Sequence, residues 1–207
     1  MNRGAPMRRV AVLTPEDQAR ADLYALQARL YAAAPDASLL ASLGAAPPLD
    51  AASPLAATWR SLTEASAAAD ADAVGEEYQA LFVGVGQSAV SLFGTAYTSG
   101  RAGRSMLVQV RASLAQLNLA RRAESTMYED HLAAVLETMR LLICGDGRPD
   151  AFAFDVQREF FVHNIGPWAP ACCSAICDKD VAIYYARAAQ FTSEFLAIER
   201  DSLAIGD

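Results

Sequence analysis

EEYQALFVGVG, the stretch from Glu76 to Gly86, has the pattern of a helix that ends at a pair of glycines. A phosphate-binding loop needs a strand before its glycines and a helix N-terminus after them. Here a helical pattern precedes the glycines, and no lysine follows in the loop. A helix C-terminus also carries the negative end of the helix dipole, which disfavours phosphate. We therefore interpret Gly84 as a helix cap in the left-handed conformation, and we expect Gly84 and Gly86 to begin a loop.

The composition around this stretch favours one all-α domain. The chain has 207 residues, of which 53% are hydrophobic and 20% charged, and such a chain can build a sizeable core. Much of the apolar share is alanine, which favours helix over sheet. The net charge of −7 argues against nucleic acid or an anionic membrane as a partner.

The compartment is also predicted from the sequence. No apolar run approaches the ~18 residues that a membrane helix needs, so we expect no membrane insertion. The apolar run within MRRVAVLTPEDQ is too short for an export signal. We therefore expect a cytoplasmic chain whose cysteines are reduced thiols. These cysteines are Cys144, Cys172, Cys173 and Cys177.

A helical period dominates the rest of the chain. Thr14-Pro15 reads as an N-cap followed by proline, and Ser53-Pro54 repeats this signal. Thr126 and Glu129 form a candidate capping box before the most regular amphipathic helix, which Gly145 ends. Helices are expected over about 15–34, 36–43, 53–69, 72–83, 104–117, 126–143, 150–164, 167–177 and 181–200. We predict a single globular helical bundle over residues 1–207, with a hinge candidate near 118–126 between its halves.

Residues 84–100, GVGQSAVSLFGTAYTSG, follow neither the helical nor the strand period. Loops of this length in compact domains are usually functional or disordered, and Phe93 and Tyr97 argue for an ordered one. Loop aromatics beside an acidic surface suit recognition of a basic, apolar peptide.

The cysteines and the Asp130-His131 pair each allow a chemical and a structural interpretation. Cys173 and Cys177 share a helix face near His163, but zinc sites usually need a second pair of ligands, so we favour core packing and no metal. Asp130 and His131 could serve a metal-dependent hydrolase with Cys144 or Ser125 as nucleophile, although no nucleophile signature surrounds either residue. We favour capping and packing for the pair, and a peptide-binding surface is the third interpretation.

The opening stretch resembles the signature of the TorD/DmsD/NarJ family of molybdoenzyme maturation chaperones. Glu77, Tyr78, Leu81, Phe82, Gly84 and Gly86 match the family's helix and glycine pair. Further along, the family's aromatic, small, serine and tyrosine positions hold Phe93, Gly94, Thr95 and Tyr97. The family's Pro-Pro is missing, because Ser91 and Leu92 stand there.

Two further blocks strengthen the resemblance. YEDHLAAVLETMRLLI is similar to the family's helix that opens on Asp-His, here Asp130 and His131. A C-terminal block contains the turn Pro167-Trp168-Ala169-Pro170, which is similar to the family's Pro-Trp-x-Pro turn. We expect Pro167, Trp168 and Pro170 to shape the scaffold.

The resemblance implies an all-α fold of about ten helices and no catalytic activity. It implies binding to the twin-arginine signal peptide on the precursor of a molybdopterin oxidoreductase, of formate dehydrogenase, DMSO/TMAO reductase or nitrate reductase type. It also implies a monomer or a domain-swapped homodimer, and no cofactor beyond weak binding of GTP or molybdopterin guanine dinucleotide. The alternatives are a small metal-dependent hydrolase or a nucleotide-binding protein that uses Asp130 and His131.

Twin arginines followed by an apolar segment require carboxylates beside an apolar groove. We expect the following residues to line or support the peptide site: Glu77, Tyr78, Leu81, Phe82, Phe93, Thr95, Tyr97, Asp130 and His131.

Overall fold

The computed structural model of the chain describes residues 13–84, 88–98, 105–121, 127–145 and 153–205. Within these ranges it contains ten α-helices and one π-helical turn, with an isolated β-bridge between Phe93 and His131. The all-α prediction is confirmed. The elements are α1 (Pro15–Ala32), α2 (Ala37–Gly44), α3 (Ala56–Ala68), α4 (Ala71–Tyr78), η1 (Gln79–Val83), α5 (Thr95–Thr98), α6 (Met106–Gln116), α7 (Leu132–Cys144), α8 (Phe154–Asn164), α9 (Ala169–Cys177) and α10 (Tyr184–Ile205).

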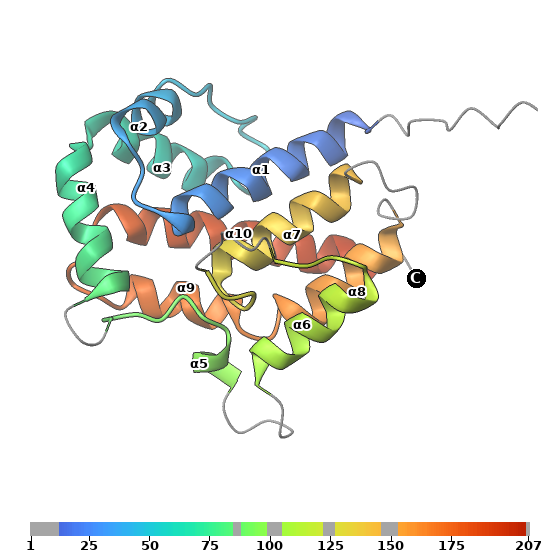
Figure 1. Cartoon of the computed structure of the whole chain (residues 1–207). Coiled ribbons are helices and arrows are strands. Elements are labelled where there is room, and N and C mark those ends of the chain that lie inside the picture. The colour runs from blue at the N-terminus through green and yellow to red at the C-terminus, as the bar shows by residue number, and fades with distance from the viewer. Residues whose placement is uncertain (1–12, 85–87, 99–104, 122–126, 146–152, 206–207) are drawn as a thin grey trace, which may run out of the picture.

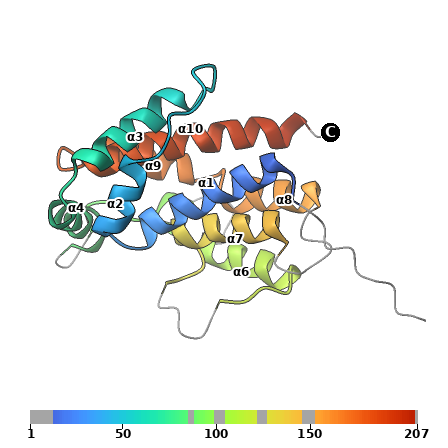
Figure 2. The same ribbon diagram turned by 90° about the horizontal axis from the view of Figure 1, so that it is seen from above.

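The long helices form the body of the molecule. In Figures 1 and 2, α1 lies along α7, while α10 runs beside α3 and α9. The core between them is apolar and rich in aromatic side chains, with Tyr24, Tyr31, Trp168 and Tyr185 fully buried. Both views place α4 at one end of the molecule, where α10 begins. No helix in the described ranges has the length and apolar character needed to cross a bilayer.

Four of the described helices, α1, α2, α4 and α6, begin at a Thr, Asp or Ser whose side chain caps the first turn. The Thr14 side chain accepts the N–H of Asp17 at 3.0 Å, and the Asp36 carboxylate accepts the N–H of Leu39 at 2.7 Å. Ser105 caps α6 in the same way, accepting the N–H of Val108. These oxygens bind N–H groups that have no partner within the first turn of a helix.

Three predicted starts are wrong. Helix α3 begins at Ala56, and Ser53 accepts the N–H of Leu55 before the helix instead of capping its first turn. Helix α10 begins at Tyr184 rather than near residue 181. The predicted capping box with Glu129 is also wrong, because His131 is the N-cap of α7. Its Thr126 lies outside the described residues, as does residue 150 before α8.

The opening stretch folds as α4 followed by η1. The single helix predicted over 72–83 is divided because the last turn, Gln79–Val83, is π-helical. Gly84 ends it with φ 62° and ψ 167°, and its N–H donates to the carbonyl oxygen of Gln79 at 2.8 Å. The positive φ matches the expected glycine cap, although ψ lies outside the left-handed helical region, in a conformation that is essentially limited to glycine. Gly86 lies outside the described residues, as do residues 122–126 of the predicted hinge, which stays a prediction.

Candidate functional site

The carboxylate of Glu77 caps the N-terminal end of α10. Its Oε1 accepts the N–H groups of Ile183 and Tyr185 at 3.0 and 2.7 Å, and its Oε2 accepts that of Tyr184 at 3.0 Å. The first N–H groups of a helix lack partners within the helix, and a negative charge there is stabilised by the helix dipole. Glu77 therefore joins α4 to α10, and both of its oxygens are bound within the chain.

The apolar residues of the opening stretch pack against the same helix. The rings of Tyr78 and Phe82 lie 5.7 and 4.9 Å from that of Tyr185, and the Tyr78 hydroxyl donates to the carbonyl oxygen of Tyr31 at 3.2 Å. Leu81 is fully buried. The π-helical turn brings Tyr78 and Phe82 into edge-to-face contact at 5.1 Å. This part of the predicted peptide site holds α4 and η1 against α1 and α10.

The second part of the predicted site is a junction between the loop 91–98 and the start of α7. The carboxylate of Asp130 accepts the N–H and the hydroxyl of Thr95 at 3.0 and 2.6 Å. The Asp130 carbonyl oxygen accepts the N–H of Gly94 at 2.8 Å, and Asp130 is 2% exposed. Phe93 lies edge-to-face on His131 at 4.9 Å. Asp130 therefore fixes the loop from inside the molecule.

His131 is neutral at physiological pH. Burial lowers the pKa of its imidazole to about 4, and the neighbouring Asp130 charge only partly opposes this. The neutral Nδ1 accepts the N–H of Ala133 at 3.2 Å, which makes the side chain the cap of α7. Cys144 is the last residue of that helix, about 20 Å from His131 by helical rise, so it cannot act with His131 as a catalytic pair. Ser125 lies outside the described residues.

The loop 91–98 also contacts the Pro-Trp-x-Pro turn through an aromatic side chain. Tyr97 stacks on Trp168 with ring centroids 6.1 Å apart, and its hydroxyl donates to the carbonyl oxygen of Ser91 at 2.7 Å. The buried Trp168 indole N–H donates to the carbonyl oxygen of Asn164 at 2.7 Å. Pro167 and Pro170 are exposed on either side of it. The loop of the first sequence block thus contacts both other blocks.

A groove lies beside the opening stretch, between α3, α4 and the start of α10. We call it the acidic groove, and its volume is about 750 Å³. It is lined by Ser61, Glu64, Ala65, Ala68, Ala69, Asp70, Ala73, Val74, Glu76, Glu77, Ala80, Val181, Ile183, Tyr184 and Arg187. Glu64, Asp70 and Glu76 are exposed, and Arg187 is the single basic residue among the lining residues.

The acidic groove also has an apolar surface. Val181 and Ile183 are 53% and 74% exposed, and both lie in the three residues before α10. Small alanine side chains from α3 and α4 and the buried Val74 form the rest of its apolar lining. The arrangement places three exposed carboxylates beside apolar side chains, which suits a ligand that is basic at one end and apolar at the other.

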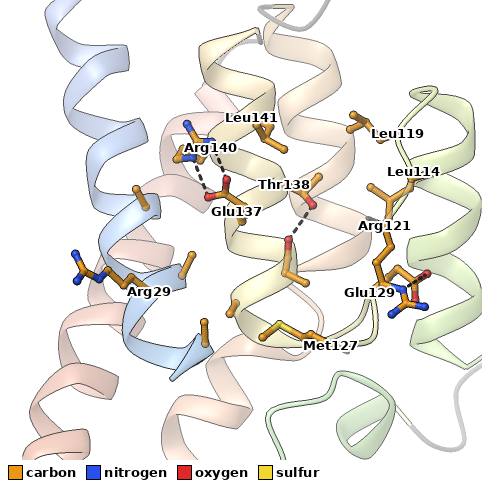
Figure 3. Close-up of a pocket in the computed structure, with 16 residues that line it drawn as sticks. Arg29, Leu114, Leu119, Arg121, Met127, Glu129, Glu137, Thr138, Arg140 and Leu141 are labelled. Atoms are coloured by element: carbon orange, nitrogen blue, oxygen red, sulfur yellow. Dashed lines mark hydrogen bonds and ion pairs between the residues drawn. The ribbon is translucent and has the colours of Figure 1, made fainter. Parts of the chain in front are cut away.

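A second groove, between α1, α6 and α7, has a different charge pattern (Figure 3). Its volume is about 670 Å³. The Arg140 guanidinium binds the Glu137 carboxylate through two bonds of 2.8 and 2.7 Å, and Arg121 lies 3.7 Å from Glu129. Charges of both signs thus line this groove in pairs, and it offers no excess negative charge to a basic ligand.

The cysteines lie mainly in the core. All four thiols are free, Cys172 and Cys173 are buried in α9, and burial raises the pKa of Cys173. Cys177 points toward the carbonyl oxygen of Ala186 at 3.7 Å. Among the described residues, no three His, Cys, Asp or Glu side chains gather as metal ligands would.

The sequence interpretation missed most of the acidic groove. Of the lining residues it named only Glu77, whose carboxylate is bound to α10. Glu64 lies on α3, and Asp70 lies between α3 and α4. Ile183 is more than a hundred residues further along the chain than either of them. The available signal was the cluster of acids on the polar faces of two consecutive helices, but most such clusters are only solvated surface.

Comparison with known proteins gives one family. The family model described as nitrate reductase delta subunit matches residues 49–174, which is more than half of the chain. The matched range includes the opening stretch, the loop junction and the Pro-Trp-x-Pro turn. No curated protein matches the chain.

Proposed function

Because the chain belongs to the nitrate reductase delta subunit family, we propose that it is a maturation chaperone that holds the twin-arginine signal peptide of a molybdopterin oxidoreductase precursor in the acidic groove. The family resemblance drawn from the sequence motifs is confirmed. Members of the family are non-catalytic chaperones, and they bind a nitrate reductase subunit. The hydrolase interpretation of Asp130 and His131 is therefore set aside.

The observation that carries the proposal is the pairing of exposed carboxylates with exposed apolar side chains in one groove. Glu64 and Glu76 offer carboxylates to two guanidinium groups, each of which can bind a carboxylate through two parallel bonds. Asp70 adds negative charge through Oδ2, because its Oδ1 caps α4 by accepting the N–H groups of Asp72 and Ala73. Val181 and Ile183 would contact the apolar residues that follow the arginines. Glu77 contributes negative charge while it caps α10, so the groove forms only when these helices are docked.

The other predicted peptide residues have a supporting role in this proposal. Phe93, Thr95, Tyr97, Asp130 and His131 fix the loop that follows η1 against α7 and α9, which keeps the α4–η1 segment in place. The encounter takes place in the cytoplasm before export, on a precursor that has not yet received its cofactor. The client is of nitrate reductase, formate dehydrogenase or DMSO/TMAO reductase type.

The proposal is tested by titrating the full chain with a fluorescent twin-arginine peptide from a molybdoenzyme encoded beside it. We expect saturable binding below roughly 50 µM, which falls at least about tenfold in the E64K/E76K variant. Raising the salt concentration should weaken binding, because exposed charges are screened beyond about 10 Å at 0.1 M salt. A peptide with both arginines replaced by glutamine should bind more weakly to the wild type.

The matched control is D22K/E159K, which makes the same charge change at two exposed positions outside the groove. It should bind the peptide as the wild type does. Asp130→Ala is a poor test, because that carboxylate is buried and holds the loop. No binding by the wild type, or equal losses in the groove and control variants, would refute the proposed site.

A further inference from the structure

The chain itself contains a segment with the chemistry of the proposed ligand. In MRRVAVL, Met7 to Leu13, two arginines are followed directly by four apolar residues. We propose that this segment of one copy occupies the acidic groove of a second copy and competes there with the precursor. The inference rests on the proposed function in one respect, that the ligand displacing the segment is the precursor peptide. The contact between copies is tested independently of that function.

Charge complementarity selects the acidic groove as the partner of this segment. Arg8 and Arg9 bring two positive charges, and the groove presents Glu64, Asp70 and Glu76 around an apolar surface. Valine, alanine and leucine after the arginines match the exposed Val181 and Ile183. The groove shown in Figure 3 is less suitable, because its carboxylates already lie beside guanidinium groups of the same chain.

The length of the segment indicates that the contact forms between copies. The Tyr78–Tyr31 hydrogen bond places the end of α4 at the C-terminal end of α1. From Thr14 to Tyr31, α1 rises about 26 Å. The five residues from Thr14 back to Arg9 can span at most ~18 Å, which is too short to return along the helix. Figures 1 and 2 agree that α1 begins at the end of the molecule away from α4.

Such a contact joins two different surfaces, the segment of one copy and the groove of another. It is therefore head-to-tail, and its extent rises with protein concentration. Because the same groove cannot hold both ligands, the precursor peptide must displace the segment, and self-association lowers the apparent affinity for the peptide.

The contact is tested by sedimentation of the full chain over roughly 5 to 200 µM, a range that covers weak self-association. The wild type should show a weight-average mass that rises with concentration. R8E/R9E and E64K/E76K should each remain monomeric over the same range. R29E/R200E makes the same charge change as R8E/R9E at two exposed arginines that lie 61% and 65% open to solvent, and it should associate as the wild type does.

A charge swap gives the sharpest outcome. Mixing R8E/R9E with E64K/E76K restores two complementary pairs, the acidic segment with the basic groove and the unchanged segment with the unchanged groove, so the mixture should associate although neither variant does alone. In the peptide titration at high protein concentration, R8E/R9E should bind the twin-arginine peptide at least about threefold more tightly than the wild type. A wild type that stays monomeric, or an R8E/R9E variant that associates like it, overturns the inference. Absence of peptide binding in both the wild type and R8E/R9E would instead refute the proposed function.

Discussion

Gly94 occupies a position that has no room for a side chain. A Cβ there would lie 2.6 Å from Cγ of Met106 and 2.8 Å from Cε2 of Trp168, and both side chains are buried. We expect Gly94→Ala to lower the free energy of unfolding by about 1–3 kcal/mol, measured in urea, because the loop must move off the tryptophan. Gly75 in α4 is the control: its Cβ would meet nothing within 4 Å. Gly75→Ala should stabilise by about 0.5–1 kcal/mol, and a similar effect at both glycines would count against this packing argument.

His131 makes stability depend on pH. Burial lowers the pKa of its imidazole from 6.5 to about 4, so between these values the unfolded chain binds a proton that the folded chain excludes. The free energy of unfolding should therefore fall as the pH drops from 6.5 toward 4, and the contribution of this residue approaches ~3 kcal/mol. Protonation of Nδ1 would also remove the acceptor that caps α7.

The His131→Asn variant isolates this contribution. Asparagine keeps a capping oxygen but does not titrate, so the variant should be less stable than the wild type near pH 7 and lose that disadvantage as the pH approaches 4.5. Urea unfolding at several pH values measures the difference. The only other histidine, His163, is exposed, and His163→Asn should follow the wild-type curve. Parallel curves for wild type and His131→Asn would show that this imidazole does not drive the dependence.

At the scale of the elements, α10 depends on a cap supplied by another helix. Replacing Glu77 with alanine leaves the N–H groups of Ile183, Tyr184 and Tyr185 without their carboxylate. We expect a loss of about 1–2 kcal/mol in the free energy of unfolding, with Glu77→Gln falling between it and the wild type. Glu76→Ala, at the exposed neighbour, should change stability by less than about 0.5 kcal/mol while weakening peptide binding. Equal stabilities of the two alanine variants would rule out the capping role.

The elements also show what the sequence could predict. Helices with a local cap, such as Thr14 before α1 and Gly145 after α7, were found because capping chemistry lies within a few residues of the helix end. The N-cap of α7 was assigned to Thr126 instead of His131, because a capping box is a common pattern while a buried, neutral histidine cap depends on tertiary burial. The capping of α10 by Glu77 joins residues more than a hundred positions apart, so no local sequence pattern predicts it.

The same limit applies to the candidate site. The motif residues from Tyr78 to Phe82 and from Phe93 to Tyr97 were recognised from their family pattern, and the structure brings the second group together with Asp130 and His131. The acidic groove was not predicted, because its acids come from separate helices and its apolar side chains from the segment before α10. Only packing brings these residues onto one surface.

At the scale of the whole molecule, a buried ion pair joins the first helix to the last. Arg20 on α1 donates from Nε and Nη2 to the carboxylate of Glu199 on α10, at 2.8 and 2.9 Å. Nη2 also donates to Gln157 on α8 at 3.1 Å, and the Tyr24 hydroxyl donates to Glu199 at 3.0 Å. Glu199 is only 2% exposed. Three helices from distant parts of the sequence thus share one charge network.

Removing one partner of this pair should cost more than removing both charges. Arg20→Ala leaves a buried carboxylate without its guanidinium, and we expect a loss of about 3 kcal/mol in the free energy of unfolding. Adding Glu199→Gln in that background should recover part of the loss, because a neutral amide is less costly to bury than a carboxylate. Urea denaturation of the wild type, both single variants and the double variant gives the coupling free energy between the two side chains, which should exceed about 1 kcal/mol.

The control is the exposed ion pair between Arg29 and Asp36, whose charged atoms lie 3.7 Å apart. Arg29→Ala breaks only this pair and should lower the free energy of unfolding by less than about 0.5 kcal/mol. Additive effects at Arg20 and Glu199 would mean that the two side chains stabilise their helices separately.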